Sequence, residues 1–301
     1  MWTTYTGEIA ALLTALFWSV TSLSFEAAGK RIGSLVVNLL RLAFAMVIYS
    51  VFLWIKRGMA LPFDATPEAW SWLALSGLVG FAVGDLLLFQ AFVVIGARLS
   101  MLLMALVPPI TALIGWGVMG EVMTPLELFG MAVTVTGVSM VVLKKEAGER
   151  GVRKMKYPLN GILLGLGGAV GQALGLVLSK FGMKDYDPFA ASQIRVMAGL
   201  AGFILIFLVM RKGPSVQRAF SDKKGIGFTA LGSVFGPFLG VSFSLLAIQH
   251  THTGVAATIM SIVPVLLIPP AILIFHEKVT WREVFGSFVA VAGVSVMFLI
   301  A

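Results

Sequence analysis

The sequence carries one pattern twice, as LELFGMAVTVTGVS at residues 126–139 and as WREVFGSFVAVAGVS at residues 281–295. Identical residues continue to align outside these stretches. A shift of 156 residues places Gly80 on Gly236, Gly84 on Gly240, Met104 on Met260, Pro108 on Pro264 and Glu127 on Glu283, and a shift of 154 places Arg41 on Arg195. So many coincidences at nearly one offset indicate an internal duplication.

The composition places the chain in a membrane. Only 12% of its 301 residues are charged, against 58% hydrophobic, and the mean hydropathy is +0.97. A soluble domain is about a quarter charged. The apolar character excludes a disordered chain, and the lack of Cys excludes a disulfide-stapled scaffold. The Lys and Arg residues that give the net charge of +8 lie between apolar runs, where they set the topology in the membrane. We therefore expect a lipid bilayer as partner and no nucleic acid.

Apolar runs long enough to cross a bilayer recur along the chain. A helix needs roughly 20 residues to cross the hydrocarbon, which admits only helices or closed barrels. The runs show no apolar–polar alternation, which disfavours strands. If one arginine is allowed in each of two runs, the sequence predicts ten transmembrane helices, at residues 9–25, 36–55, 69–84, 99–120, 128–143, 157–179, 189–210, 225–249, 253–275 and 284–301.

A charged segment, KKEAGERGVRKMK, divides the chain almost in half. The prediction is a first five-helix repeat at residues 1–143, a basic linker at 144–156 and a second five-helix repeat at 157–301. Because five crossings are an odd number, the second repeat enters the membrane from the opposite side. The predicted fold class is therefore all-α integral membrane, with two inverted repeats, an arrangement typical of secondary transporters. In the alternative interpretation, the duplication only enlarged a helical bundle.

The end of each half, residues 97–143 and 254–299, resembles the EamA repeat of the drug/metabolite transporter superfamily. Each has a proline in its fourth helix, a Glu followed by a Thr at the end of that helix, and a glycine-rich fifth helix. The resemblance extends to FWS at residues 17–19 and to the arginine of the second helix, so it covers essentially the whole chain. It implies a ten-helix bundle that carries small metabolites, often outward, without nucleotide hydrolysis, and it names no substrate.

Two arginines and one acid are the leading candidates for a substrate site. Arg41 and Arg195 lie inside predicted spans, where a charge facing lipid is costly, so both should face the interior. They either bind an anionic group of the substrate or serve as structural cations. Asp85 has no acidic counterpart at Val241. It is either a coupling site for a proton or cation, a counter-ion to a substrate amine, or a structural partner of an arginine.

Further residues are candidates for the walls of a central substrate cavity. Trp18, Phe17, Asn38 and Gln172 are candidate substrate-binding wall residues. In the second half Gly171 and Gln172 replace Phe17 and Trp18, so we expect an aromatic wall on one side only.

Local signals along the chain point to structure rather than chemistry. Pro108 and Pro264 should bend their helices at a gate. The segments TPLE and TWRE fit capping boxes, and we expect Glu26 to anchor its helix at the membrane interface. No metal site and no cofactor are predicted.

Charge between the spans predicts the orientation. Four Lys and Arg would be cytoplasmic if the amino terminus were inside, against sixteen on the other face. The positive-inside rule therefore places both termini outside and the linker in the cytoplasm, although some transporters that the chain resembles keep their termini inside. The predicted location is the plasma membrane.

The predicted function is secondary active transport of small metabolites by alternating access, as an exporter of amino acids or related solutes. Two other classes stay open. A membrane-embedded enzyme or lipid-handling protein would show turnover, although no His, Asp or Glu cluster has catalytic spacing. A passive channel would show flux that neither saturates nor supports counterflow.

Overall fold

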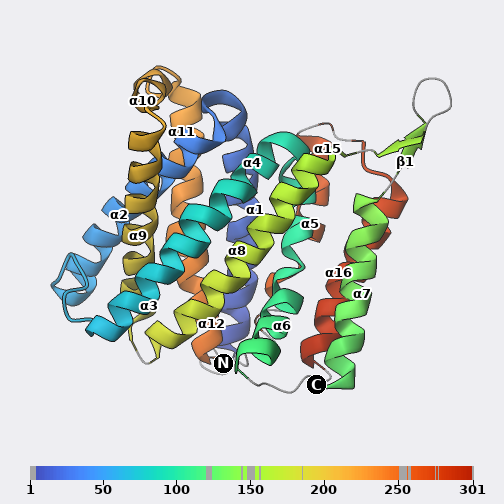
Figure 1. Cartoon of the computed structure of the whole chain (residues 1–301), viewed down its shortest axis with the longest axis horizontal. Coiled ribbons are helices and arrows are strands. Elements are labelled where there is room, and N and C mark those ends of the chain that lie inside the picture. Colours follow the sequence, from blue (N-terminus) through green and yellow to red (C-terminus); the bar gives the residue numbers. More distant parts are fainter. Residues whose placement is uncertain are drawn as a thin grey trace.

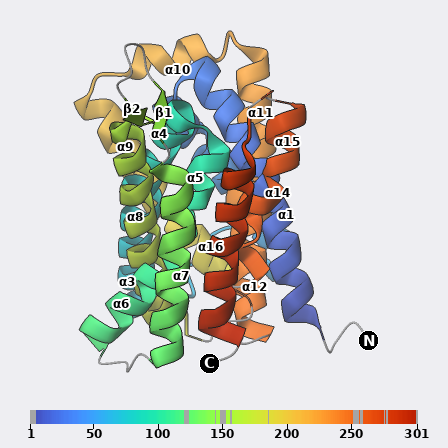
Figure 2. The ribbon, with the colours of Figure 1, turned by 90° about the vertical axis from the view of Figure 1, so that its right-hand side faces the viewer.

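The helices of the computed structural model run up and down through one bundle (Figures 1 and 2). The structure describes residues 5–119, 124–143, 145–147, 153–155, 157–184, 186–250, 256, 259–274, 276 and 278–299. The first half contains α1 (Thr6–Ile32), α2 (Ser34–Arg57), α3 (Pro67–Gly77), η1 (Leu78–Gly84), α4 (Asp85–Ile95), α5 (Ala97–Met104), α6 (Val107–Met119) and α7 (Pro125–Val142). The second half contains α8 (Leu159–Met183), α9 (Pro188–Val209), α10 (Gly213–Ala219), α11 (Lys223–Ser233), η3 (Val234–Gly240), α12 (Val241–His250), α14 (Val263–Leu266), α15 (Ile268–Leu273) and α16 (Trp281–Leu299).

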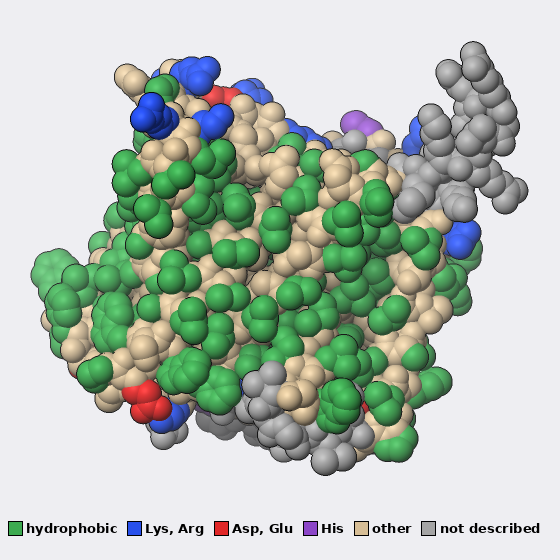
Figure 3. All heavy atoms as spheres, in the orientation of Figure 1, with side chains coloured by type: hydrophobic (Ala, Val, Ile, Leu, Met, Phe, Trp, Pro, Cys, Tyr) green, Lys and Arg blue, Asp and Glu red, His purple; other side chains and the backbone are tan. Residues whose placement is uncertain are grey.

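The helices suit a membrane in length and composition. In the described part of the chain, eight helical runs are long and apolar enough to cross a bilayer, and a shorter apolar helix covers Val263–Leu273. The chain is a multi-pass membrane protein, while the predicted count of ten spans stays a prediction. Hydrophobic side chains cover the middle of the surface in Figure 3, and most of the visible charges lie at its upper and lower edges. This distribution matches a belt of lipid around the bundle.

The bundle is all-α, as predicted, and one short ribbon lies outside it. Strands β1 (Lys145–Ala147) and β2 (Arg153–Met155) pair antiparallel within the predicted linker, with Lys145 opposite Met155. The rest of the linker and residues 1–4 lie outside the described residues. We call the side of the bundle that carries this ribbon the linker face; it is the upper edge in Figure 1.

The two halves run in opposite directions. In Figure 1, α1 rises from the lower edge, whereas α8 descends from the linker face. The backbone irregularities repeat as well, because the π-helical segments η1 and η3 are separated by the same 156 residues as the sequence pattern. Turns after Met104 and after Met260 interrupt matching helices in the same way. The duplication is therefore a duplication of structure.

Helices α7 and α16 pack against each other reciprocally, side by side in both ribbon views (Figures 1 and 2). A Cβ atom built on Gly137 would lie 2.3 Å from the backbone nitrogen of Ala290, and one built on Gly293 would lie 2.3 Å from that of Thr134. Small residues allow this approach, which is the usual basis of helix association in lipid. The contact joins the end of one repeat to the end of the other.

The capping box predicted for α7 is confirmed. Thr124 Oγ1 accepts a hydrogen bond from the backbone nitrogen of Glu127 at 3.2 Å, and the Glu127 carboxylate accepts one from the backbone nitrogen of Thr124 at 2.6 Å. At α16, the backbone nitrogen of Thr280 donates to Glu283 Oε2 at 3.0 Å. These bonds satisfy N–H groups that the first turn of a helix leaves free.

The interfacial role predicted for Glu26 is wrong. Its side chain is 2% exposed, pairs with Lys30, and accepts a hydrogen bond from the backbone nitrogen of Ala97 at 2.7 Å. Helix α5 starts against α1 at this point, so its first turn presents free N–H groups to the carboxylate. Glu26 therefore fastens the start of α5 to α1.

Candidate functional site

A central cavity of about 260 Å³ lies between the two halves. Its lining comes from α1, α2, η1, α4, α5 and α6 of the first half and from α8, α9, η3, α12 and α14 of the second half. The lining residues include Trp18, Arg41, Phe81, Asp85, Phe89, Gln172, Arg195 and Val241. Most of the wall is apolar, so any charged group in it acts in surroundings of low polarity.

The first arginine of the cavity is neutralised by an acid. Arg41 Nη2 lies 2.5 Å from Asp85 Oδ2, and the two side chains are 4% and 6% exposed. Arg41 comes from α2, and Asp85 is the first residue of α4, directly after the π-helical segment η1. The structure therefore pairs Asp85 with Arg41, while a coupling role for Asp85 stays a prediction.

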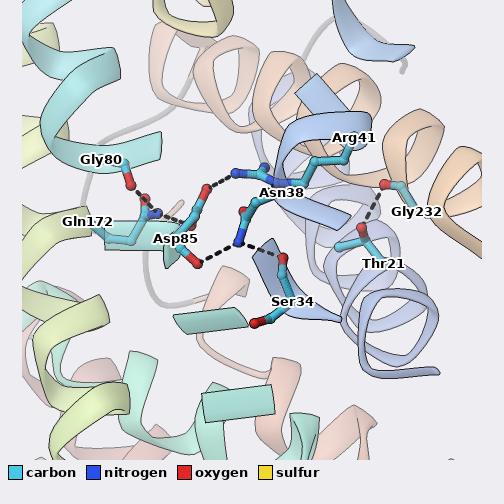
Figure 4. Close-up of polar contacts among 8 residues, drawn as sticks. All are labelled: Thr21, Ser34, Asn38, Arg41, Gly80, Asp85, Gln172 and Gly232. Carbon is cyan, nitrogen blue, oxygen red and sulfur yellow. Dashed lines mark hydrogen bonds and ion pairs between the residues drawn. The ribbon is translucent and has the colours of Figure 1, made fainter. Parts of the chain in front are cut away.

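Two amides complete this pair (Figure 4). Asn38 accepts a hydrogen bond from Arg41 Nε at 3.0 Å and donates to the backbone oxygen of Asp85 at 3.2 Å. Gln172 Nε2 donates to Asp85 Oδ1 at 2.5 Å and to the backbone oxygen of Gly80 at 3.3 Å. Each carboxylate oxygen of Asp85 therefore has a donor, and Gln172 brings its own donor from the second repeat. Asp85 ties the two halves together at the cavity.

Aromatic rings surround the two guanidinium groups. The Arg41 guanidinium lies 4.5 Å from the ring centre of Phe89, and that of Arg195 lies 4.7 Å from the ring centre of Phe81. Phe81 also lies 5.8 Å from Arg41, so one ring stands next to both cations. Such contacts are worth about 2 kcal/mol or more when desolvated. These rings were not predicted from the sequence, because the sequence of an apolar helix does not indicate which of its phenylalanines face a cation.

The second arginine of the cavity, Arg195, is not held in an ion pair by any described residue. Arg195 is 5% exposed, and its Nε has no hydrogen-bond partner. Among the described residues, no carboxylate lies within ion-pair distance of its guanidinium. The repeat explains the difference, because the position that matches Asp85 is Val241. Among the described lining residues, the site thus contains two cations at equivalent positions and one anion.

The remaining predicted residues divide into lining and supporting positions. Trp18, Pro108 and Pro264 line the cavity together with Gln172. Among the described lining residues, Phe17 and Asn38 do not occur. The ring of Phe17 packs 5.6 Å from that of Phe235 and 5.5 Å from that of Phe243.

The two predicted bends lie beside breaks in their helices. Pro108 follows the turn between α5 and α6, and Pro264 follows the turn that precedes α14. Both prolines therefore stand where the cavity wall changes from one short helix to the next.

A second buried ion pair lies away from the cavity. Arg98, at the start of α5, has its Nη2 3.6 Å from Glu283 Oε2, and the two side chains are 5% and 0% exposed. The Tyr157 hydroxyl donates to Glu283 Oε1 at 3.1 Å. Glu283 was predicted only as a helix cap, so its pairing across the two halves is a finding of the structure.

Comparison with known proteins agrees with this architecture. The model of the EamA-like transporter family matches residues 5–143 and again residues 159–299. No curated protein matches the chain. Chains of solved structures do match, 24 in all, and one described only as "Crystal structure of protein" is 16% identical, with a TM-score of 0.65, covering 98% of this chain and 97% of that chain. At that identity it shows the fold alone. The predicted resemblance is confirmed, and the chain belongs to the EamA-like transporter family of the drug/metabolite transporter superfamily.

Proposed function

We propose that the protein is a secondary active transporter of the plasma membrane that exports amino acids or related small solutes by alternating access. The observation that carries the proposal is Arg195, a buried cation in a cavity between two inverted repeats, with no acid of the described residues within ion-pair distance. A buried charge without a partner is costly, and a ligand that neutralises it recovers that cost on binding. Inverted repeats around a midplane site support rocking between two open states.

The lining of the cavity favours a small solute with one anionic group and an apolar body. A carboxylate can accept two parallel hydrogen bonds from a guanidinium, and Arg195 is the cation that Asp85 leaves unneutralised. Trp18, Phe89 and Met104 offer apolar surface to the remainder of such a solute. A large hydrophilic sugar would leave most of its hydroxyl groups without partners.

Asp85 is the proposed coupling site for a proton or cation. When the carboxylate is charged, it holds Arg41 from the first half and Gln172 from the second. A proton on Asp85 removes that charge and weakens both contacts, which loosens the two halves at the cavity. Coupling would then follow from one acid that serves both as an ion site and as a contact between the repeats.

The first test is transport by the purified protein in liposomes, with thermal unfolding as a screen for the solute. We expect a carboxylate with an apolar body to raise the melting temperature more than sugars, nucleotides or cationic drugs, since ligands stabilise the state that they bind. The same solute should show saturable uptake and counterflow when it is loaded on the opposite side.

Each other class of function has its own outcome in this test. Flux without saturation or counterflow would favour a passive channel, and chemical conversion of the solute would favour an enzyme. The family is one of transporters rather than enzymes, which supports the expectation of saturable uptake with counterflow.

A further inference from the structure

An apolar groove lies on the outside of the bundle, away from the central cavity. It runs between α2 and α9 and ends below α10. Its lining includes Leu39, Ile204, Phe207, Leu208, Arg211 and Val216. Leu208 is 70% exposed in the part of the chain that crosses the bilayer, so this side of α9 faces lipid. In the membrane, acyl chains would fill the groove.

Basic side chains stand at the end of this groove on the linker face. Helix α9 ends at Val209, and Arg211 and Lys212 follow with exposed side chains. Figure 3 shows blue side chains gathered at the upper left, directly above the green band of apolar surface. Arg31 on the same edge is held by Asp222 at 2.8 Å. Among the described residues, no carboxylate pairs with Arg211 or Lys212.

The backbone at Arg211 is unusual. The backbone nitrogen of Lys212 donates to Phe207 oxygen at 3.1 Å, and that of Arg211 donates to Leu208 oxygen at 3.2 Å. These two bonds form a Schellman motif, in which the residue at the position of Arg211 adopts a left-handed conformation and is usually glycine. Arg211 has a φ of 50°. An arginine therefore occupies a strained position that glycine would fill without strain.

We propose that this groove binds a phospholipid with an anionic headgroup. One acyl chain lies along Leu39, Ile204 and Phe207, and the phosphate is bound by Arg211 and Lys212. The strain at Arg211 is retained because the guanidinium is needed at the rim of the groove, which is where strained residues tend to act as ligand clamps. Anionic lipids are enriched in the cytoplasmic leaflet, and the positive-inside rule assigns the linker face to that side. The site is separate from the transport cavity and does not depend on the proposed function.

The test compares lipid binding by the full-length protein with its stability. The purified protein in neutral detergent is given equal amounts of phosphatidylglycerol and phosphatidylcholine, and retained lipid is counted by native mass spectrometry. We expect one phosphatidylglycerol to be retained in preference to phosphatidylcholine. Arg211→Gly should weaken this retention about fivefold, the effect of one basic residue at a lipid surface, and Arg211→Gly with Lys212→Gln should weaken it further. Without lipid, Arg211→Gly should melt at the same or a higher temperature, because the strain is relieved.

Two control variants separate the headgroup from the fold. Lys184 also has a positive φ, of 41°, directly after α8 and beside Glu68 at the opposite edge of the bundle. Lys184→Gly should leave phosphatidylglycerol retention unchanged. Ile204→Trp fills the groove without altering charge, and it should release the lipid although both cations remain.

Three results would overturn the proposal. The first is equal retention of the two lipids by the wild type. The second is equal loss from Lys184→Gly and Arg211→Gly, which would point to a general effect of charge. The third is full displacement of the lipid by millimolar inorganic phosphate or glycerol phosphate, together with no effect of Ile204→Trp. That result would make the site an ion site and not a lipid site.

Discussion

Asp85→Ala is expected to destabilise the protein by about 3–5 kcal/mol and to abolish transport. The substitution leaves Arg41 as a second uncompensated cation in an apolar cavity, 3% exposed. It also removes one of the two acceptors of the Gln172 amide, which leaves only the backbone oxygen of Gly80 to hold that side chain to the first repeat. Thermal unfolding in detergent measures the loss of stability, and solute uptake into liposomes measures the loss of transport.

A double variant distinguishes the structural role of the pair from its functional role. Arg41→Leu combined with Asp85→Leu removes both charges and replaces them with apolar groups, which is often neutral or stabilising for a buried pair. We expect the melting temperature to recover while transport stays absent. If Asp85→Ala alone melted like the wild type and still transported, the pair would be neither a structural contact nor a coupling site.

Arg195→Gln is expected to weaken substrate binding strongly without harming the fold. Among the described residues, no acid lies within ion-pair distance of this guanidinium, so its removal takes a charge without a close counter-ion out of a buried position. We expect an unchanged or higher melting temperature. Loss of one partner of a buried, hydrogen-bonded charge pair costs about 2–5 kcal/mol, so affinity for an anionic solute should fall by the corresponding factor. The comparison of KM for uptake in the two proteins measures this effect.

Arg195→Lys supplies the matched control. It keeps the charge but loses the planar pair of donors, so binding should be intermediate if the anionic group is held in bidentate fashion. Uptake by Arg195→Gln with the wild-type KM would show that the solute does not use this guanidinium. The substrate would then be recognised through the apolar wall alone.

The fold could be predicted from the sequence because its signals are repeated and local. The offset of 156 residues recurs in the structure as two π-helical segments and as two matching helix breaks. Apolar runs located the helices, and TPLE located the start of α7. Residues 145–147 and 153–155 form strands because two short segments of the linker pair with each other, a contact that neither periodicity nor hydropathy reports.

The sequence predicted which charged and amide residues belong to the candidate site, but not which of them pair with each other. Arg41, Asp85, Arg195 and Gln172 all line one cavity. Which arginine Asp85 would neutralise depends on how each helix is rotated, and a single apolar helix carries little information on rotation. Phe17 illustrates this limit, because a position one residue from Trp18 turns toward other aromatic rings and away from the cavity.

The most direct test of the central claim is the accessibility of the cavity from each side of the membrane. The chain has no cysteine, so Met104→Cys and Met260→Cys each introduce a single thiol at matching positions of the two repeats, both lining the cavity. Oriented vesicles are treated with a membrane-impermeant maleimide from one side and then, in a separate sample, from the other. Alternating access predicts that each thiol is labelled from both sides and that a transported solute slows the labelling. Labelling of both thiols from one side only, whichever side holds the solute, would contradict transport through this cavity.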